Sequence, residues 1–161
     1  MTTQGHDLDN IIAFTVDGQR FALPLSSVMR VIPVVEITPL PNAPAVIIGM
    51  INIRGAVIPV ADMRKRMGMA PREQRLDDKF IIVKTPTRTL ALTADEVAVA
   101  VESRQEDFIV AGEVAPGLKH IKGVAKLAGG LTLIHDIDGF LSIEEEQILD
   151  IAMKKTGNPG N

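Results

Sequence analysis

The stretch GMINIRGAVIPVAD, residues 49–62, alternates apolar and polar side chains before a second apolar run. Ile51 and Ile53 point to one side of an extended strand, so Asn52 and Arg54 point to the other. The alternation predicts a short strand that carries a polar pair, Asn52 and Arg54. This pair either faces solvent, with the arginine stem lying on apolar neighbours, or is presented to a partner.

An internal repeat extends outward from this stretch. Without gaps, 49–62 aligns with GVAKLAGGLTLIHD at 123–136, and glycine, apolar and aspartate positions coincide. FALPLSSVMRVI at 21–32 aligns in the same way with LALTADEVAVAV at 90–101. A repeat of this length predicts two structurally similar halves, at about 11–69 and 78–141.

Each half consists of short apolar runs separated by turn residues. NIIAFTV and QRFALPL flank Asp17-Gly18, which is a hairpin signal. Gly55 joins the two strands of the opening stretch, and Pro33 places its own strand at a sheet edge or a bulge. Four or five short strands per half indicate two small barrels, so the predicted fold class is all-β.

A C-terminal helix is predicted over 142–155. Ser142 and Glu145 have the spacing of a capping box, and acidic residues at the start with lysines at the end suit the helix dipole. Its apolar stripe is assigned to Ile148, Ile151 and Ala152. The segments 1–10 and 156–161 are expected to be flexible tails.

A shorter helix is predicted after Asp62, which has the position of an N-cap residue, with Gly68 as the stop. The basic run 64–66 is interpreted as the wet face of this helix, with a partner contact as the alternative.

Composition excludes several classes of protein. The chain has 161 residues, 46% of them hydrophobic, which suits one ordinary domain. A net charge of −3 with only five aromatic residues argues against a nucleic-acid surface. No apolar run approaches the roughly 20 residues of a membrane span. The chain is therefore predicted to be cytoplasmic, without direct membrane insertion.

The residues that carry chemistry do not form a recognisable catalytic or metal site. There is no cysteine, and His6, His120 and His135 lack metal-ligand spacing. In GEVAPGLKH, at 112–120, Leu118 stands where a phosphate loop needs lysine. We therefore predict no catalytic residue, no cofactor and no metal, and interpret the acidic residues as solvated turns and caps.

The opening stretch resembles the CheW-like family of bacterial chemosensory adaptors. That family shows the pattern N-[LI]-R-G-x-[VI]-[IL]-P-[VI]-x-[DN]-[LM]-R, which is filled here by Asn52, Ile53, Arg54, Gly55, Ile58, Pro59, Val60, Asp62 and Arg64. ITPLPNAP before it and LTLIHDIDGFL near the C-terminus also resemble the family. The resemblance covers about residues 11–143.

The resemblance implies a single domain, 11–143, of two five-stranded SH3-like barrels packed together. It also implies a non-catalytic adaptor that couples cytoplasmic tips of chemoreceptors to a regulatory domain of the histidine kinase CheA. Such adaptors are recruited to membrane-associated arrays, in which they can self-associate. The implied partner-binding residues are Val28, Arg30, Asn52, Ile53, Arg54, Gly55 and Asp62.

One position departs from the family. Its common V-x-E pair falls on Val28 and Arg30, so an arginine replaces a glutamate. This reversal of charge suggests a non-standard partner in a divergent, non-motility chemosensory pathway.

A second hypothesis is a small barrel that binds a metabolite or has an unrecognised enzymatic activity. It predicts a polar pocket with perturbed ionisable groups. An adaptor instead predicts exposed apolar and charged patches.

Overall fold

The computed structural model describes residues 10–102, 108–110, 120–127 and 130–155. The segments expected to be tails, except Asn10, and the glycine-containing loop 112–117 lie outside the described residues. The strands are β1 (Asn10–Val16), β2 (Gln19–Pro24), β3 (Val28–Pro33), β4 (Ile47–Ile53), β5 (Ala56–Ala61), β6 (Lys79–Lys84), β7 (Thr89–Ala94), β8 (Glu96–Glu102), β9 (Phe108–Val110), β10 (Ile121–Leu127) and β11 (Gly130–His135). The helices are η1 (Leu25–Ser27), α2 (Met63–Arg66) and α4 (Ile143–Lys155).

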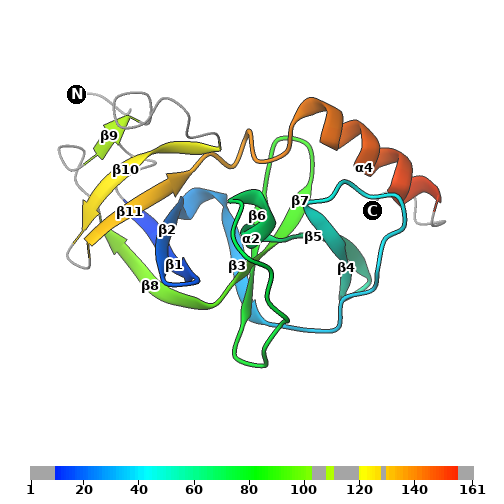
Figure 1. Ribbon diagram of the computed structural model, residues 1–161, viewed down its shortest axis with the longest axis horizontal. Helices are drawn as coiled ribbons and strands as arrows, with labels where there is room; N and C mark the ends of the chain where they lie inside the picture. Colours follow the sequence, from blue (N-terminus) through cyan, green and yellow to red (C-terminus); the bar gives the residue numbers. More distant parts are fainter. Residues whose placement is uncertain (1–9, 103–107, 111–119, 128–129, 156–161) are drawn as a thin grey trace. The chain divides into compact units, whose positions relative to one another are not determined.

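The strands form two sheets (Figure 1). One has six strands in the order β8-β1-β2-β11-β10-β9, and the other has five in the order β3-β6-β7-β5-β4. The all-β prediction with a C-terminal helix is confirmed. The six-stranded sheet contains one strand more than expected, the three-residue β9. Within the described residues, hydrogen bonds do not close either sheet into a complete barrel.

Both sheets are built around β-hairpins, and the first hairpin has the tight turn that Asp17-Gly18 predicts. Asp17 and Gly18 both have positive φ, at 53° and 79°. Two positive φ values define the tight turn that matches the twist of the flanking strands. The Asp17 amide also donates to Oδ2 of Asp95 at 2.8 Å.

In each sheet a short parallel contact joins two hairpins. Phe21 and Ala22 of β2 pair with Leu133 and Ile134 of β11 in the six-stranded sheet. Phe21, Ala22 and Ile134 are almost completely buried. The parallel contact therefore lies inside the apolar core of its sheet.

The five-stranded sheet repeats this contact in the same register. Val60 of β5 pairs with Ala91 of β7, and the repeat equates these two residues with Ile134 and Ala22. The predicted internal repeat is therefore present in the register of the strand pairs.

The compact units differ from the contiguous halves 11–69 and 78–141 that the repeat predicts. One unit is built from segments 1–29 and 95–140, and the other from 30–94 and 141–161. The hairpin β1–β2 pairs with β10–β11 from the far end of the chain, whereas β6–β7 pairs with the earlier β4–β5. A repeat identifies equivalent segments, but it does not specify which copies pair.

Each unit has its own apolar core. Ile11, Ala22, Ala125 and Ile134 form a buried cluster in the first unit. In the second unit the cluster consists of Ile51, Ile58, Val60, Phe80, Ile82 and Ala91. His135, predicted to be a surface or satisfied histidine, is completely buried beside Phe21 and Phe140, with ring centroids at 5.4 and 5.7 Å.

α4 begins with the predicted capping box. The Glu145 amide donates to Oγ of Ser142 at 3.0 Å, and the Ser142 amide donates to Oε1 of Glu145 at 2.9 Å. The same carboxylate receives two hydrogen bonds from Arg66, at 2.9 and 2.8 Å. This bidentate pair ties the first turn of α4 to α2.

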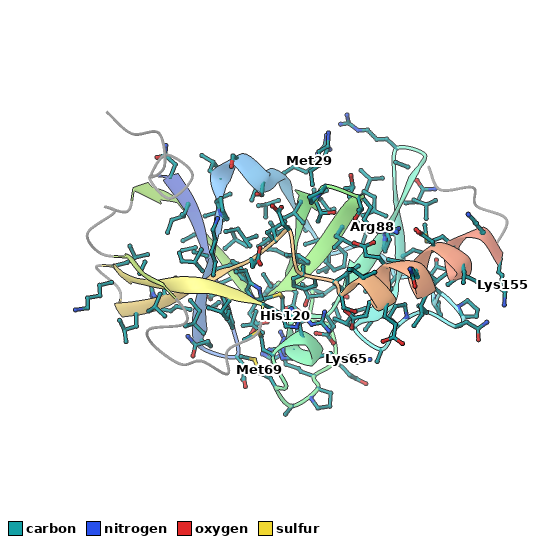
Figure 2. All side chains as sticks on the ribbon, turned by 90° about the horizontal axis from the view of Figure 1, so that it is seen from above. Met29, Lys65, Met69, Arg88, His120 and Lys155 are labelled. Atoms are coloured by element: carbon teal, nitrogen blue, oxygen red, sulfur yellow. The ribbon has the colours of Figure 1, made fainter. Side chains whose placement is uncertain are left out.

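A second arginine holds α4 from the β6–β7 turn (Figure 2). Arg88 donates to Oε1 of Glu146 at 2.7 Å and also to the carboxylate of Asp150. Burial alone lowers the pKa of Arg88, but the hydrogen bonds to Asp150 and Glu146 outweigh it and raise that pKa. Arg88 therefore remains charged.

The buried face of α4 differs from the predicted stripe. Leu149, Ala152 and Met153 are buried, whereas Ile148 and Ile151 are exposed. Of the predicted stripe only Ala152 is correct. The prediction failed because two overlapping sets of apolar residues have helical spacing, and the arginine partners of the acidic side chains decide between them.

The predicted ends of α2 are confirmed, but the prediction that residues 64–66 form its solvent-exposed face is wrong. Asp62 Oδ1 accepts from the Arg64 amide at 2.9 Å, and Gly68 has a φ of 70° just after the helix. Arg64 is only 6% exposed, however, and Arg66 is paired with Glu145. Only Lys65 of the basic run is fully exposed.

Gly49 provides a test of the packing in the second unit. A Cβ added there would lie 2.5 Å from both the Thr38 carbonyl oxygen and Cγ2 of Ile37. Because Thr38 and Met50 exchange two 2.8 Å backbone hydrogen bonds, this segment cannot move away cheaply. We expect Gly49→Ala to lower the free energy of unfolding by about 2–4 kcal/mol in chemical denaturation.

Gly18→Ala is the matched control for Gly49→Ala. Gly18 also has a positive φ, but its added Cβ would have open space, so only backbone strain of about 1–2 kcal/mol applies. Equal losses at the two glycines would contradict the close approach at Gly49.

Candidate partner-binding surface

The β4–β5 turn is a rigid two-residue hairpin connection. Arg54 and Gly55 both have positive φ, at 53° and 89°, between the paired residues Ile53 and Ala56. Oδ1 of Asn52 accepts from the Gly55 amide at 2.8 Å. The Asn52 side chain thus locks the turn, a structural role that the sequence prediction did not give it.

Arg54 occupies the exposed first position of this turn. The prediction that it points away from the core side is consistent with Ile51 being buried and Ile53 packing against the core cluster. Its backbone, however, is left-handed rather than extended. This conformation costs a residue other than glycine or asparagine roughly 1–2 kcal/mol. A non-glycine residue kept in a strained conformation at an exposed tip is a candidate for function.

β3 presents a second candidate surface at the edge of the five-stranded sheet. Arg30 is exposed and Val28 is half-buried. On the opposite face of the strand, Met29 is 57% and Val31 is 37% exposed. Exposed apolar side chains on an edge strand are typical of an interaction surface.

The sequence prediction did not include Met29 and Val31. The alternation of VMRVIP could have indicated them, because it places Met29 and Val31 on one face of the strand and Val28 and Arg30 on the other. That pattern could not show which face the core covers.

The structure brings together only some of the predicted residues. Asn52, Ile53, Arg54 and Gly55 share one turn, whereas Arg30 lies on the edge strand at the other end of the strand order. Asp62 follows β5 at the end away from the turn, about 20 Å along the strand from Gly55. Its carboxylate caps α2.

The metabolite-binding alternative predicts a polar pocket, and the second unit has a pocket lined by both charged and apolar side chains. Its lining includes Asp62, Arg64, Arg72 and Asp78. Asp78 accepts from Nη2 of Arg72 at 2.9 Å and from the Arg75 amide at 2.8 Å. Both pocket carboxylates therefore already hold local structure together. Among the described residues, no group of three or more acidic or histidine side chains could hold a metal ion.

Over the described ranges, no helix is both long and apolar enough to cross a bilayer.

An all-β chain with a rigid polar turn and an exposed apolar edge strand is a protein-binding module. Comparison with known proteins identifies the family. The model of the CheW-like domain matches residues 10–145, and the chain belongs to that family.

The relatives agree with this assignment over most of the chain. The chemotaxis protein CheW of Rhizobium meliloti (strain 1021) is 28% identical over 91% of this chain and 94% of its own length. That of Treponema pallidum (strain Nichols) is 24% identical over 86% and 85%. The crystal structure of scaffolding protein TtCheW from Thermoanaerobacter tengcongensis superposes with a TM-score of 0.77, at 26% identity over 85% of this chain and 94% of that one.

The family assignment gives the function of the chain. It is a non-catalytic scaffold of the CheW type, which couples chemoreceptors to the kinase CheA. The predicted adaptor class is confirmed.

The strain at Arg54 predicts that the turn can be stabilised. In Arg54→Asn the side chain tolerates the left-handed conformation, so we expect the free energy of unfolding to rise by about 0.5–1 kcal/mol. Urea denaturation measures the change. Arg75→Asn, at an exposed loop position, is the control and should stay within about 0.5 kcal/mol of the parent. A destabilised Arg54→Asn protein would mean that the Arg54 side chain supports the fold.

Proposed function

We propose that the β4–β5 turn and the β3 edge are the surfaces through which this scaffold contacts a regulatory domain of CheA and the cytoplasmic tip of a chemoreceptor. The observation that carries this proposal is the exposed, strained arginine at position 54. The residues involved are Val28, Arg30, Asn52, Ile53, Arg54 and Gly55.

The geometry assigns these residues different tasks. Arg54 supplies an exposed guanidinium with five donors, which suits a carboxylate on a partner. Asn52 and Gly55 hold the turn backbone from which the Arg54 side chain extends. A rigid turn reduces the ordering cost of binding. Asp62, the N-cap residue of α2, acts on the partner surface only indirectly, by positioning that helix.

The cellular setting follows from the same proposal. The scaffold acts in the cytoplasm and is recruited to membrane-associated receptor arrays, in which copies of it also contact one another. Because Arg30 stands where the family commonly has glutamate, its partner is a divergent receptor or kinase of a non-motility pathway.

Reversal of the charge at Arg54 tests the turn. In Arg54→Glu the fold should persist, because the side chain is exposed. A central charged contact contributes about 2 kcal/mol, so affinity for a CheA regulatory domain should fall roughly thirtyfold in calorimetry.

Arg75→Glu is the matched control, because it makes the same change of net charge at another exposed position of the second unit. It should leave affinity within about threefold. Equal losses in the two variants would point to a long-range charge effect and would refute the contact at Arg54.

A partner swap tests Arg30. A standard receptor whose basic residue meets glutamate would be repelled by Arg30, and like-charge contacts cost several kcal/mol across an interface. Arg30→Glu should therefore improve binding to a standard receptor tip and weaken binding to the native partner. Both effects should shrink in high salt, because exposed charges are screened.

Lys65→Glu, an exposed charge reversal on α2, is the control for the swap. If Arg30→Glu changes neither affinity by more than about twofold, Arg30 is a solvated edge residue and the divergent-partner proposal fails.

A further inference from the structure

α4 has apolar residues on two faces, and only one of these faces is buried. Leu149, Ala152 and Met153 are buried against the second unit. On the outer face, Ile151 is 54% and Ile148 is 38% exposed. The outer face therefore presents two adjacent isoleucines at i, i+3 spacing.

These isoleucines belong to a longer pattern with internal symmetry. Glu144, Ile148, Ile151 and Lys155 are separated by four, three and four residues, so they lie on one face of the helix. All four are exposed, and Lys155 lies at the far end of α4 in Figure 2. The spacing is the same in both directions. When the pattern is reversed, glutamate coincides with lysine and one isoleucine with the other.

We propose that this face of α4 binds the same face of a second copy of the chain, with the two helices antiparallel. The twofold axis passes between Ile148 and Ile151, so Ile148 of each copy packs on Ile151 of the other. Glu144 of each copy then lies opposite Lys155 of the other. Such a contact is isologous, as a closed dimer requires. It names the surface for the self-association that forms part of the proposed function.

The charges on α4 favour a second copy over other occupants. Glu145, Glu146 and Asp150 are already bound to Arg66 and Arg88 inside the unit. The outer face thus has one acid at its start and basic residues at its end. A helix that lies on a membrane instead has a lysine- and arginine-rich polar face.

The contact is small, so it belongs to the weak and transient class of interfaces. Two isoleucines per helix and two ion pairs per dimer give a dimer only at high protein concentration in dilute solution. Copies held side by side in an array have a raised effective concentration, which favours a second, weak contact.

Charge reversal with mixing tests the proposal by sedimentation equilibrium over a concentration series. Glu144→Lys alone and Lys155→Glu alone each place like charges at both ends of the homodimer. Each should dimerise about tenfold more weakly than the parent. An equimolar mixture of the two variants makes both contacts opposite in charge again and should regain parental affinity. The double variant should regain it as well.

The mixing experiment distinguishes a lost contact between chains from a destabilised fold. Glu144→Lys also loses a favourable interaction with the helix dipole, but mixing leaves each chain unchanged, so only an intermolecular contact can be restored. Ile148→Gln with Ile151→Gln should abolish dimerisation. Leu76→Gln, which changes a 93% exposed leucine elsewhere in the second unit, should not.

The orientation has its own test, because the chain contains no cysteine. A mixture of Glu144→Cys and Lys155→Cys should form a heterodimeric disulfide, whereas parallel helices would join like positions. A parent that stays monomeric throughout the series, a dimer unaffected by the glutamine changes, or failure of mixing to restore affinity would overturn the proposal. Two further measurements separate this proposal from that for the β4–β5 turn. The α4 variants should still bind a CheA regulatory domain, and Arg54→Glu should still dimerise, so each proposal can fail without the other.

Discussion

The fold depends on the short parallel contact between hairpins in each sheet. β2 meets β11 and β5 meets β7 through only two residue pairs each. In the six-stranded sheet these pairs join opposite ends of the chain. Closing so long a loop costs conformational entropy before any contact is made, and the compensation comes from burying residues such as Phe21 and Val60. The junction residues other than Leu133 are accordingly buried in both sheets.

The exchange of hairpins between the halves gives the chain its two units. β3 stands at the point of exchange, because Met29 belongs to one unit and Arg30 to the next. β3 is also the edge strand of its sheet, so one of its sides has no neighbouring strand. This position explains why Met29 and Val31 remain exposed while Ile32 packs against the core of the second unit.

Much of the local structure could be predicted because neighbouring residues determine it. Asp17-Gly18 dictates a tight hairpin turn, and Ser142 with Glu145 forms a capping box from residues only three apart. The repeat also relates the two parallel contacts, since it equates Ala22 with Ala91.

What failed depended on residues distant in the sequence. Two copies of a repeat can pair within a half or across halves, and nothing local decides between them. Within the candidate site, the residue types at Asn52 and Arg54 indicated an exposed polar pair, but not that Asn52 would lock the turn or that Arg54 would be left-handed. Those features follow from the two-residue loop, which only the pairing of Ile53 with Ala56 fixes.

The orientation of α4 shows how charges decide what an apolar pattern leaves open. Turning the helix would bury Ile148 and Ile151 in place of Leu149 and Met153. It would also carry Glu145 and Glu146 away from Arg66 and Arg88, whose side chains are only 11% and 15% exposed. Largely buried guanidinium groups without acceptors cost far more than an exposed isoleucine. The ion pairs thus favour the observed orientation of α4, in which Ile148 and Ile151 stay outside.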